Sequence, residues 1–225
     1  MPRTARAVEA GTIYHVCNRG NGRLRLFHKR GDYDAFVRIL AEACKRHDAA
    51  LMAYCLMPNH WHLVLLPHSA TALARFVGWL CVTHVRRHHE HYHTTGGGHL
   101  YQGRYKSFPT QDDSHLLTVL RYVEANACRA KLVRRAEEWR YGSLWARAQA
   151  DAAVPLGEWP LDRPRDWTAI VNEAISENSL EQVRRCVKRG RPYGSEEWVR
   201  KTAKRLGLEF TLRERGRPRK NRSKQ

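Results

Sequence analysis

Three features are scarce in this 225-residue sequence: long apolar runs, paired cysteines and acidic side chains. No apolar run approaches the roughly 20 residues that a membrane-spanning helix needs, and no apolar stretch follows the first residues as in a signal peptide. The six cysteines include no Cys-x-x-Cys pair, which excludes a zinc ribbon and favours isolated thiols in a reducing cytosol. We therefore expect a cytoplasmic protein that is not held by a membrane.

Acidic residues number 22 against 40 Lys and Arg, which gives a formal net charge of +18 at pH 7. A fold gains nothing from this self-repulsion, and the usual use of such charge is long-range attraction to a polyanion. Hydrophobic residues make up 42% of the chain, too many for a disordered polycation. Nucleic acid is therefore the expected partner, and an acidic membrane surface is the weaker alternative.

The positive charge is unevenly distributed along the chain. Residues 1–150 carry a net charge of +11, residues 151–183 a net charge of −5 and residues 184–225 a net charge of +12. The stretch 154–164 is rich in proline and has no periodicity, which predicts a linker. We expect a folded domain over 1–150, an acidic linker or helical segment over 151–183, and a basic helical tail over 184–225 that binds nucleic acid. Within this tail, Trp198, Val199, Thr202 and Leu206 recur at helical spacing.

Hydrophobic periodicity predicts alternating strands and helices in the first part. Strands are expected at 11–17, 51–57 and 60–66, and the last two form a hairpin around Pro58 and Asn59. Helices are expected after Asp32, over about 71–93 and after Ser114, with an extended segment at 100–108. This order predicts an α+β, ferredoxin-like fold in which helices pack on an antiparallel sheet.

The second strand of the hairpin carries two histidines two positions apart. Successive side chains on a strand point to opposite faces, so His60 and His62 share one face while Trp61 and Leu63 share the other. Imidazoles about 7 Å apart along a strand can hold one metal ion. For an isolated His-x-His, a hydrogen-bonded structural pair is the commoner explanation.

The helix after Ser114 places Tyr122 and Asn126 on one face, one turn apart. Its apolar stripe, which includes Leu116 and Leu120, lies roughly 100° away, so Tyr122 is not needed to complete the stripe. A tyrosine at the edge of such a stripe is more often a rim residue of the core than a nucleophile.

Several motifs together resemble the single-tyrosine HUH transposases, and most of all the REP-associated tyrosine transposases. They are Ile13-Tyr-His-Val-Cys-Asn-Arg-Gly-Asn21, Asn59-His-Trp-His62, Tyr101-Gln-Gly-Arg-Tyr-Lys-Ser107, Tyr122-Val-Glu-Ala-Asn126 and Trp139-Arg-Tyr-Gly-Ser-Leu-Trp145. The resemblance covers roughly residues 11–147 with the motifs in the expected order. Where the family usually has Asn-Pro-Val-Arg-Ala, this chain has Asn126-Ala-Cys-Arg-Ala130, which changes the helix end but removes no reactive group.

The resemblance implies a role for each of these residues. His60 and His62 would hold one divalent cation, Mg²⁺ or Mn²⁺, with the amide oxygen of Asn126 as a third ligand. Tyr122 would attack single-stranded DNA beside a hairpin such as a REP element, giving a covalent 5′-phosphotyrosine and a free 3′-hydroxyl. His115, one heptad before Tyr122 on the same face, is the candidate general base.

Basic side chains are expected to bind the DNA. The candidates in the first part are Arg19, Arg23, Arg25, Lys29, Arg30, Arg104, Lys106, Arg121 and Arg129. In the tail, the sequence Arg-Gly-Arg-Pro occurs twice and resembles the core of an AT-hook, so Arg189, Arg191, Arg215 and Arg217 are candidates for the minor groove. A solvated tail with non-specific phosphate affinity explains the repeat equally well.

These observations favour a bacterial, nucleoid-associated, metal-dependent DNA endonuclease and strand transferase of the transposase type. We expect a monomer, with a dimer as the alternative. A non-catalytic nucleic-acid-binding protein that keeps the fold is the first rival, and a hydrolase that leaves Tyr122 dispensable is the second. Both histidines, the tyrosine and the asparagine are present at the matching positions, which argues against loss of the chemistry.

Overall fold

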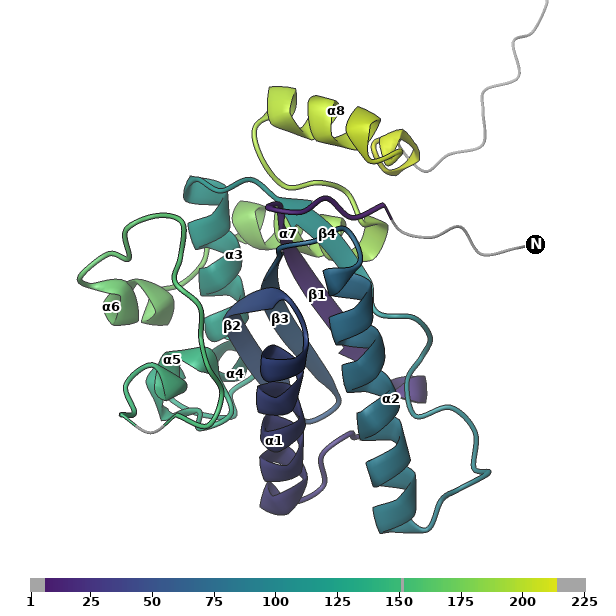
Figure 1. The fold of residues 1–225 in the computed structure, drawn as a ribbon. Coiled ribbons are helices and arrows are strands. Elements are labelled where there is room, and N and C mark those ends of the chain that lie inside the picture. The colour runs from purple at the N-terminus through teal and green to yellow at the C-terminus, as the bar shows by residue number, and fades with distance from the viewer. Residues whose placement is uncertain (1–6, 151, 214–225) are drawn as a thin grey trace, which may run out of the picture.

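The computed structural model describes residues 7–150 and 152–213, and its centre is a four-stranded antiparallel sheet (Figure 1). The strands are β1 (Ile13–Arg19), β2 (Ala49–Met57), β3 (His60–Pro67) and β4 (Lys106–Thr110), in the spatial order β2-β3-β1-β4. Strands β2 and β3 form the predicted hairpin, in which Met57 pairs with His60. The sheet with its packed helices confirms the α+β, ferredoxin-like fold.

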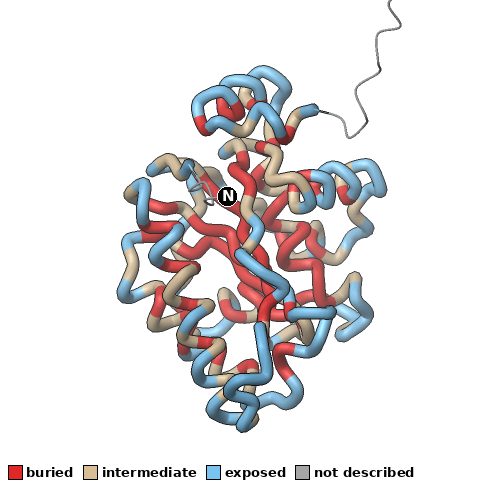
Figure 2. The backbone as a smooth tube through the Cα atoms, turned by 90° about the vertical axis from the view of Figure 1, so that its right-hand side faces the viewer, coloured by how far each residue is buried: buried red, intermediate tan, exposed pale blue. Residues whose placement is uncertain are grey.

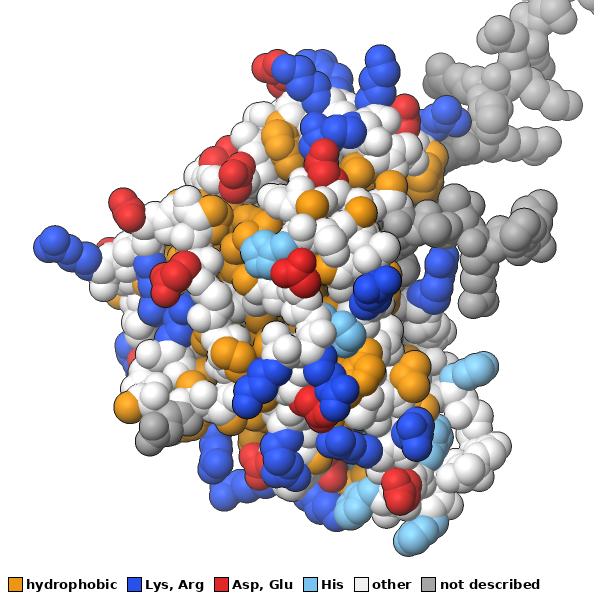
Figure 3. All heavy atoms as spheres, in the orientation of Figure 1, with side chains coloured by type: hydrophobic (Ala, Val, Ile, Leu, Met, Phe, Trp, Pro, Cys, Tyr) orange, Lys and Arg blue, Asp and Glu red, His pale blue; other side chains and the backbone are white. Residues whose placement is uncertain are grey.

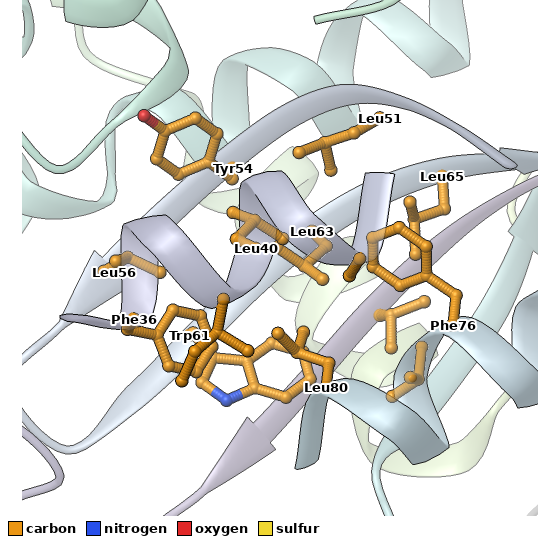
Figure 4. Packing of buried hydrophobic residues seen from close by; sticks show 14 of the residues in the cluster. Phe36, Leu40, Leu51, Tyr54, Leu56, Trp61, Leu63, Leu65, Phe76 and Leu80 are labelled. Atoms are coloured by element: carbon orange, nitrogen blue, oxygen red, sulfur yellow. The ribbon is translucent and has the colours of Figure 1, made fainter. Parts of the chain in front are cut away.

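Two long helices cover one face of the sheet (Figure 1). They are α1 (Arg30–Arg46) and α2 (Ala72–Tyr92). Phe36 and Leu40 of α1, and Phe76 and Leu80 of α2, lie four positions apart on their helices and pack with Trp61 of β3 (Figure 4). The even–odd alternation of β3 therefore holds, since its odd-numbered side chains fill this first core.

A buried polar chain lies within this first core, in the second half of α2. His84, His88, His89, His91 and His93 crowd this part of the sequence, and the lack of nearby Cys or acidic partners favours a solvated helix end over a metal site. His84 is 5% exposed, and its Nδ1 lies 2.6 Å from the hydroxyl of Tyr101. The indole N–H of Trp61 donates to the same hydroxyl oxygen at 3.0 Å. His91 and His93 are exposed and His89 is half-buried, so a solvated helix end is found for the last turn of α2, whereas for His84 the prediction is wrong.

The opposite face of the sheet is covered by shorter helices. They are α3 (Ser114–Glu124), α4 (Asn126–Arg129), α5 (Ser143–Ala146), α6 (Trp167–Asn172) and α7 (Glu177–Arg189). A carboxylate oxygen of Asp113 accepts a hydrogen bond from the backbone N–H of His115 and caps the start of α3. The predicted stripe of Leu116 and Leu120 is fully buried in this second core beside Val64 of β3.

The predicted linker at 154–164 lies against the sheet instead of spanning freely between two parts. The backbone N–H of Gly157 donates to the carbonyl oxygen of Leu51, and the indole of Trp159 donates to that of Met52. Farther along, Trp167 and Val171 are 2% and 1% exposed in the second core. Residues 152–190 therefore complete the core, and the lack of hydrophobic periodicity at 154–164 reflects irregular packing along an edge strand.

The first Arg-Gly-Arg-Pro repeat forms the end of α7. Gly190 has the left-handed φ of 70° that commonly ends a helix, and Tyr193 then pairs with Thr110 at the edge of β4. An AT-hook needs an extended chain, so that interpretation is wrong for Arg189 and Arg191 in this fold. The second repeat, with Arg215 and Arg217, lies outside the described residues.

The end of the described chain is helical, as its periodicity predicts. Helix α8 (Glu196–Arg205) and the short 3₁₀ turn η3 (Glu209–Thr211) follow the edge contact of Tyr193. Figure 2 shows buried backbone through the sheet and exposed backbone at the helix ends. None of the helices within 7–150 and 152–213 is long and apolar enough to cross a membrane.

Candidate active site

A cavity of about 670 Å³ opens on the α3 side of the sheet, where β1 ends and β3 begins. Its lining comes from the two strands (Cys17, Asn18, Arg19, His60, His62), from α3 and α4 (Tyr122, Asn126, Arg129), from the start of β4 and the loop before it (Gln102, Gly103, Arg104, Lys106), and from α7 (Arg184, Val187, Lys188). The four residues predicted to carry the chemistry therefore line one cavity, although Tyr122 follows His62 by sixty positions.

The two histidines of β3 are each held through one ring nitrogen. Nδ1 of His60 lies 2.7 Å from the side-chain oxygen of Asn59, and Nδ1 of His62 lies 2.8 Å from Nε2 of His15. The Asn59 oxygen only accepts, so His60 carries its proton on Nδ1 and keeps a lone pair on Nε2. The two ring centroids are 5.0 Å apart. This arrangement leaves both Nε2 atoms for a shared ligand.

Burial keeps these imidazoles neutral at physiological pH. It lowers the pKa of His60 to about 4, with a further contribution from the charge of Arg19. It lowers the pKa of His15 to about 3 and that of His62 well below the usual range. The neutral imidazole is the form that binds a metal ion, so no proton has to be displaced.

His15 and Cys17 were not predicted as site residues. They share a face of β1, and β1 pairs with β3 so that Cys17 stands opposite His62. The ligand atoms of His15, Cys17 and His62 lie within 4.8 Å of one another, the one such cluster of His, Cys, Asp and Glu among the described residues. Alternation along β1 predicts that His15 and Cys17 share a face, but only the pairing of β1 with β3 brings these side chains beside His62.

The His15–Cys17–His62 cluster is better suited to supporting the site than to holding a metal ion by itself. Two of its nitrogens are already joined by the 2.8 Å hydrogen bond, and burial raises the pKa of the Cys17 thiol to about 12. A protonated thiol is a poor ligand for Mg²⁺ or Mn²⁺. Two neutral imidazoles and an amide oxygen, as His60, His62 and Asn126 provide, fit a divalent ion that keeps several waters.

Tyr122 is 7% exposed and both packs on the second core and lines the cavity. Its ring stands at 90° to that of His62, with 5.7 Å between the centroids. The guanidinium of Arg129 lies 5.0 Å from the centroid of the tyrosine ring. Burial raises the pKa of Tyr122, while the charge of Arg129 opposes that rise. The hydroxyl is therefore protonated at rest, with a cation beside it that favours the phenolate.

Asn126 begins α4, directly after the end of α3. Its side-chain N–H donates to the carbonyl oxygen of Val123 at 3.4 Å, which turns the amide oxygen away from that bond. Asn126 is 8% exposed and lines the cavity with the two histidines. The break between α3 and α4 thus places an oxygen ligand one turn beyond Tyr122.

Among the residues that the structure describes, six cations and no carboxylate line the cavity. Four of them were predicted from sequence, namely Arg19, Arg104, Lys106 and Arg129, and two more, Arg184 and Lys188, come from α7. Helix α7, which packs on β4 and α3, brings these last two cations into the lining, and no sequence pattern predicts that placement. The face that carries α1 and α2 instead shows side chains of both signs interspersed (Figure 3).

Three other predicted DNA-binding residues within the described chain, Arg121, Arg189 and Arg191, lie outside the cavity. Arg121 points toward the connection between α6 and α7, where its guanidinium donates to the carbonyl oxygen of Ala174 at 3.2 Å. Arg189 lines a neighbouring cavity, and Arg191 lies beyond the end of α7.

The basic loop predicted to contact DNA stands next to the hairpin turn. The short turn η1 (Asn21–Arg23) and the residues after it carry Arg23 and Arg25, both exposed, and the side chain of Asn59 donates to the carbonyl oxygen of Arg23. Lys29 and Arg30 follow at the start of α1. Arg23 and Arg25 therefore form a basic surface beside the hairpin turn and outside the lining of the cavity, whereas the ammonium of Lys29 lies 2.8 Å from Nε2 of His91 at the end of α2.

His115 does not reach the cavity. It lies at the start of α3, with Nδ1 2.7 Å from a carboxylate oxygen of Asp113 and its ring against Tyr193. Tyr122 is two helical turns away, about 10 Å along the axis. The interpretation of His115 as the general base is therefore wrong.

The fold and this cavity place the chain in the class of DNA transposases, as comparison with known families shows. The family described as "Transposase IS200 like" matches residues 9–126, more than half of the chain. The chain belongs to this IS200-like transposase family and is an enzyme of that class. The matched residues include His60, His62, Tyr122 and Asn126, whereas α7 lies outside the match.

Two solved structures are similar in fold. A REP-associated tyrosine transposase bound to a REP hairpin matches with 15% identity and a TM-score of 0.51, over 72% of this chain and 95% of that chain. A predicted transposase from Deinococcus radiodurans R1 matches with 18% identity and a TM-score of 0.39, over 58% of this chain and 92% of that chain. No curated protein matches the chain. At 15% identity, the first structure supports the fold.

Proposed function

We propose that the protein is a metal-dependent endonuclease and strand transferase for single-stranded DNA beside hairpins of the REP type. The observation that carries this proposal is the position of Tyr122, whose ring lies 5.7 Å from that of His62 in a cavity lined by His60, Asn126 and six cations. The solved structure of similar fold was determined with a REP hairpin, which supports the choice of substrate.

In the proposed reaction, the Tyr122 oxygen attacks phosphorus. A bond forms between that oxygen and the 5′-phosphate, and the bond from phosphorus to the 3′-oxygen breaks. The phenol proton passes to water, and the departing 3′-oxygen takes a proton to become a hydroxyl. Attack by a 3′-hydroxyl on the phosphotyrosine reverses these bond changes and joins a strand. Arg129 favours this route because its charge stabilises the phenolate.

His60 and His62, through Nε2, and Asn126, through its amide oxygen, would hold the divalent cation. When bound, that ion supplies a Lewis acid for the scissile phosphate. Mixed imidazole and oxygen ligands favour Mn²⁺, or Mg²⁺ with retained waters. The described lining carries no carboxylate, so the positive charge of the ion would be neutralised by the phosphate of the DNA and not by the protein.

The DNA is proposed to reach the site along the basic lining of the cavity. Arg19, Arg104 and Lys106 are placed to hold phosphates of the single strand, and the surface of Arg23 and Arg25 is placed to hold the hairpin beside the turn. Both sheet edges pair with segments of the same chain, at Gly142 beside β2 and at Tyr193 beside β4. This pairing supports a monomer, because it occupies edges that a second copy would otherwise extend.

The division at residue 150 stays a prediction. Residues 152–190 contribute Trp167 to the second core and Arg184 to the cavity, so the functional unit is proposed to extend through α7. The basic residues beyond Arg213 remain candidates for additional contacts to DNA.

A covalent adduct tests the proposal. Labelled hairpin DNA with a single-stranded flank is incubated with the protein and Mn²⁺ or Mg²⁺, and a denaturing gel resolves protein-linked label. We expect an adduct that Tyr122→Phe and EDTA each abolish, while Tyr193→Phe leaves it. Cleavage without adduct, unaffected by Tyr122→Phe, would support the hydrolase instead. DNA binding without cleavage under any metal would support the non-catalytic alternative.

A further inference from the structure

A second cavity, of about 550 Å³, lies between the edge strand β4, the end of α7 and the turn η3. It has four lining residues in common with the active-site cavity: Arg104, Lys106, Val187 and Lys188. The two spaces are therefore neighbours along one wall, and a chain leaving the active site across β4 enters the second cavity directly.

The second cavity combines positive charge with an apolar wall. Arg104, Lys106, Lys188 and Arg189 line it, and none of its described lining residues is Asp or Glu. Arg189 also donates to the carbonyl oxygen of Arg213, which holds the end of the described chain beside the cavity. The face of α1 and α2 mixes both signs, so the lack of acids here is local (Figure 3).

The apolar wall comes from the segment after α8. Leu206, Leu208 and Phe210 line it, and Phe210 is 62% exposed. Few large hydrophobic side chains of the described chain are so exposed, and Phe210 is the aromatic one among them. A cationic wall facing an exposed aromatic ring matches a nucleotide, in which phosphate and base present the complementary surfaces.

We propose that this second cavity binds nucleotides of the single strand that flank the scissile phosphate. The base stacks on Phe210, and the phosphates lie against Lys188 and Arg189. The inference rests on the proposed function, because the strand must first enter the active-site cavity. It assigns a substrate-binding role to residues 188–210, which lie beyond the matched family region at 9–126.

Binding of single-stranded oligonucleotides by the full chain tests the inference, with Tyr122→Phe as the background so that no covalent trapping occurs. Oligonucleotides extend from the hairpin by one to six nucleotides on either the 5′ or the 3′ side, and fluorescence anisotropy gives the affinity of each. Phe210→Ala and the pair Lys188→Gln with Arg189→Gln are compared with matched controls on the far face. These controls are Val82→Ala, an exposed apolar position on α2, and Arg38→Gln, an exposed cation on α1.

Extension of the oligonucleotide on one side of the hairpin should raise its affinity for the protein with an unaltered second cavity. Phe210→Ala should reduce that gain in affinity about five- to tenfold, as expected for one lost base stack. The two controls should keep the gain. Equal gains in Phe210→Ala and in the control would overturn the inference. Adduct formation is measured in parallel in chains with Tyr122 intact, where the control Val82→Ala should give the adduct yield of the unaltered chain. A missing adduct would instead count against the proposed function, so the two failures are distinguishable.

Discussion

Nε2 of His15 on β1 lies 2.8 Å from Nδ1 of His62, the second histidine of the His-x-His motif on the neighbouring strand β3. This contact fixes the orientation of the His62 ring. His15 is fully buried and stacks on Phe108, with 4.8 Å between the ring centroids. With Nδ1 of His62 held in this way, its Nε2 is directed to a ligand. His15 is therefore a positioning residue for the metal ligand.

Replacing His15 by Phe should weaken metal binding while preserving the stack on Phe108. Loss of the hydrogen bond to His62 should lower Mn²⁺ affinity about 10- to 100-fold, as for other partners of metal-bound histidines. Isothermal titration with Mn²⁺ measures this change without DNA, and adduct formation should recover at high Mn²⁺. Unchanged Mn²⁺ affinity in His15→Phe would remove His15 from this role.

Replacing Arg129 by Gln should slow formation of the covalent adduct. The guanidinium lies 5.0 Å from the centroid of Tyr122 and is the cation best placed to stabilise a phenolate there. Loss of one preorganised group that stabilises developing negative charge costs about 100- to 1000-fold in rate. Single-turnover kinetics on a denaturing gel at saturating DNA measures the step. Arg121→Gln is the matched control, because Arg121 bonds to the carbonyl of Ala174 outside the cavity, and an equal loss in both variants would contradict the role of Arg129.

The ordered motifs made much of the site predictable. His60 and His62 share a face because strand side chains alternate, and Tyr122 and Asn126 share a cavity wall because they are one helical turn apart. Periodicity describes one element at a time. The contribution of His15 depends on the pairing of β1 with β3, and that of Arg184 depends on where α7 packs, so neither follows from spacing within its own element.

The same limitation applies to the segment predicted as a linker. Proline and the absence of periodicity at 154–164 describe a chain without regular structure, and they do not say whether that chain is free or packed. Trp159 and Trp167 meet edge to face with 5.0 Å between ring centroids, and Trp167 donates to the buried carboxylate of Glu124 at 2.6 Å. These long-range contacts decide that the segment belongs to the core.

Two truncations should therefore behave differently. Ending the chain at Pro155 removes Trp167 and α7 from the second core, so the product should lose cooperative unfolding. Ending it at Arg213 keeps every described element and removes a net charge of +5. This shorter chain should unfold like the full chain, but its affinity for DNA should be lower. The dependence of that affinity on salt should also be shallower, by about 0.7–0.9 in slope for each lost phosphate contact.

Thermal unfolding and anisotropy titrations at several salt concentrations measure both effects. A cooperative, stable fragment ending at Pro155 would show that the acidic segment is dispensable for the core.

Stability should fall with acid in a way that depends on His84. The Tyr101 hydroxyl accepts from the indole N–H of Trp61 and lies 2.6 Å from Nδ1 of His84, so a neutral His84 can accept the hydroxyl proton in this buried site. Burial accordingly lowers the pKa of His84 to about 3 in the folded chain, against about 6.5 when it is unfolded. The unfolded state therefore binds the extra proton between these values, and the stabilisation that is complete above pH 6.5 is lost as the pH falls toward 3. At pH 5 the shifted pKa of His84 should lower the free energy of unfolding by about 2 kcal/mol.

Urea unfolding at pH 7.5 and pH 5.0 should show that the free energy of unfolding of His84→Asn falls about 2 kcal/mol less between the two conditions than that of the wild type. His93→Asn, exposed at the end of α2, is the control and should follow the wild type. Equal losses in His84→Asn and the wild type would show that His84 does not govern this part of the acid sensitivity.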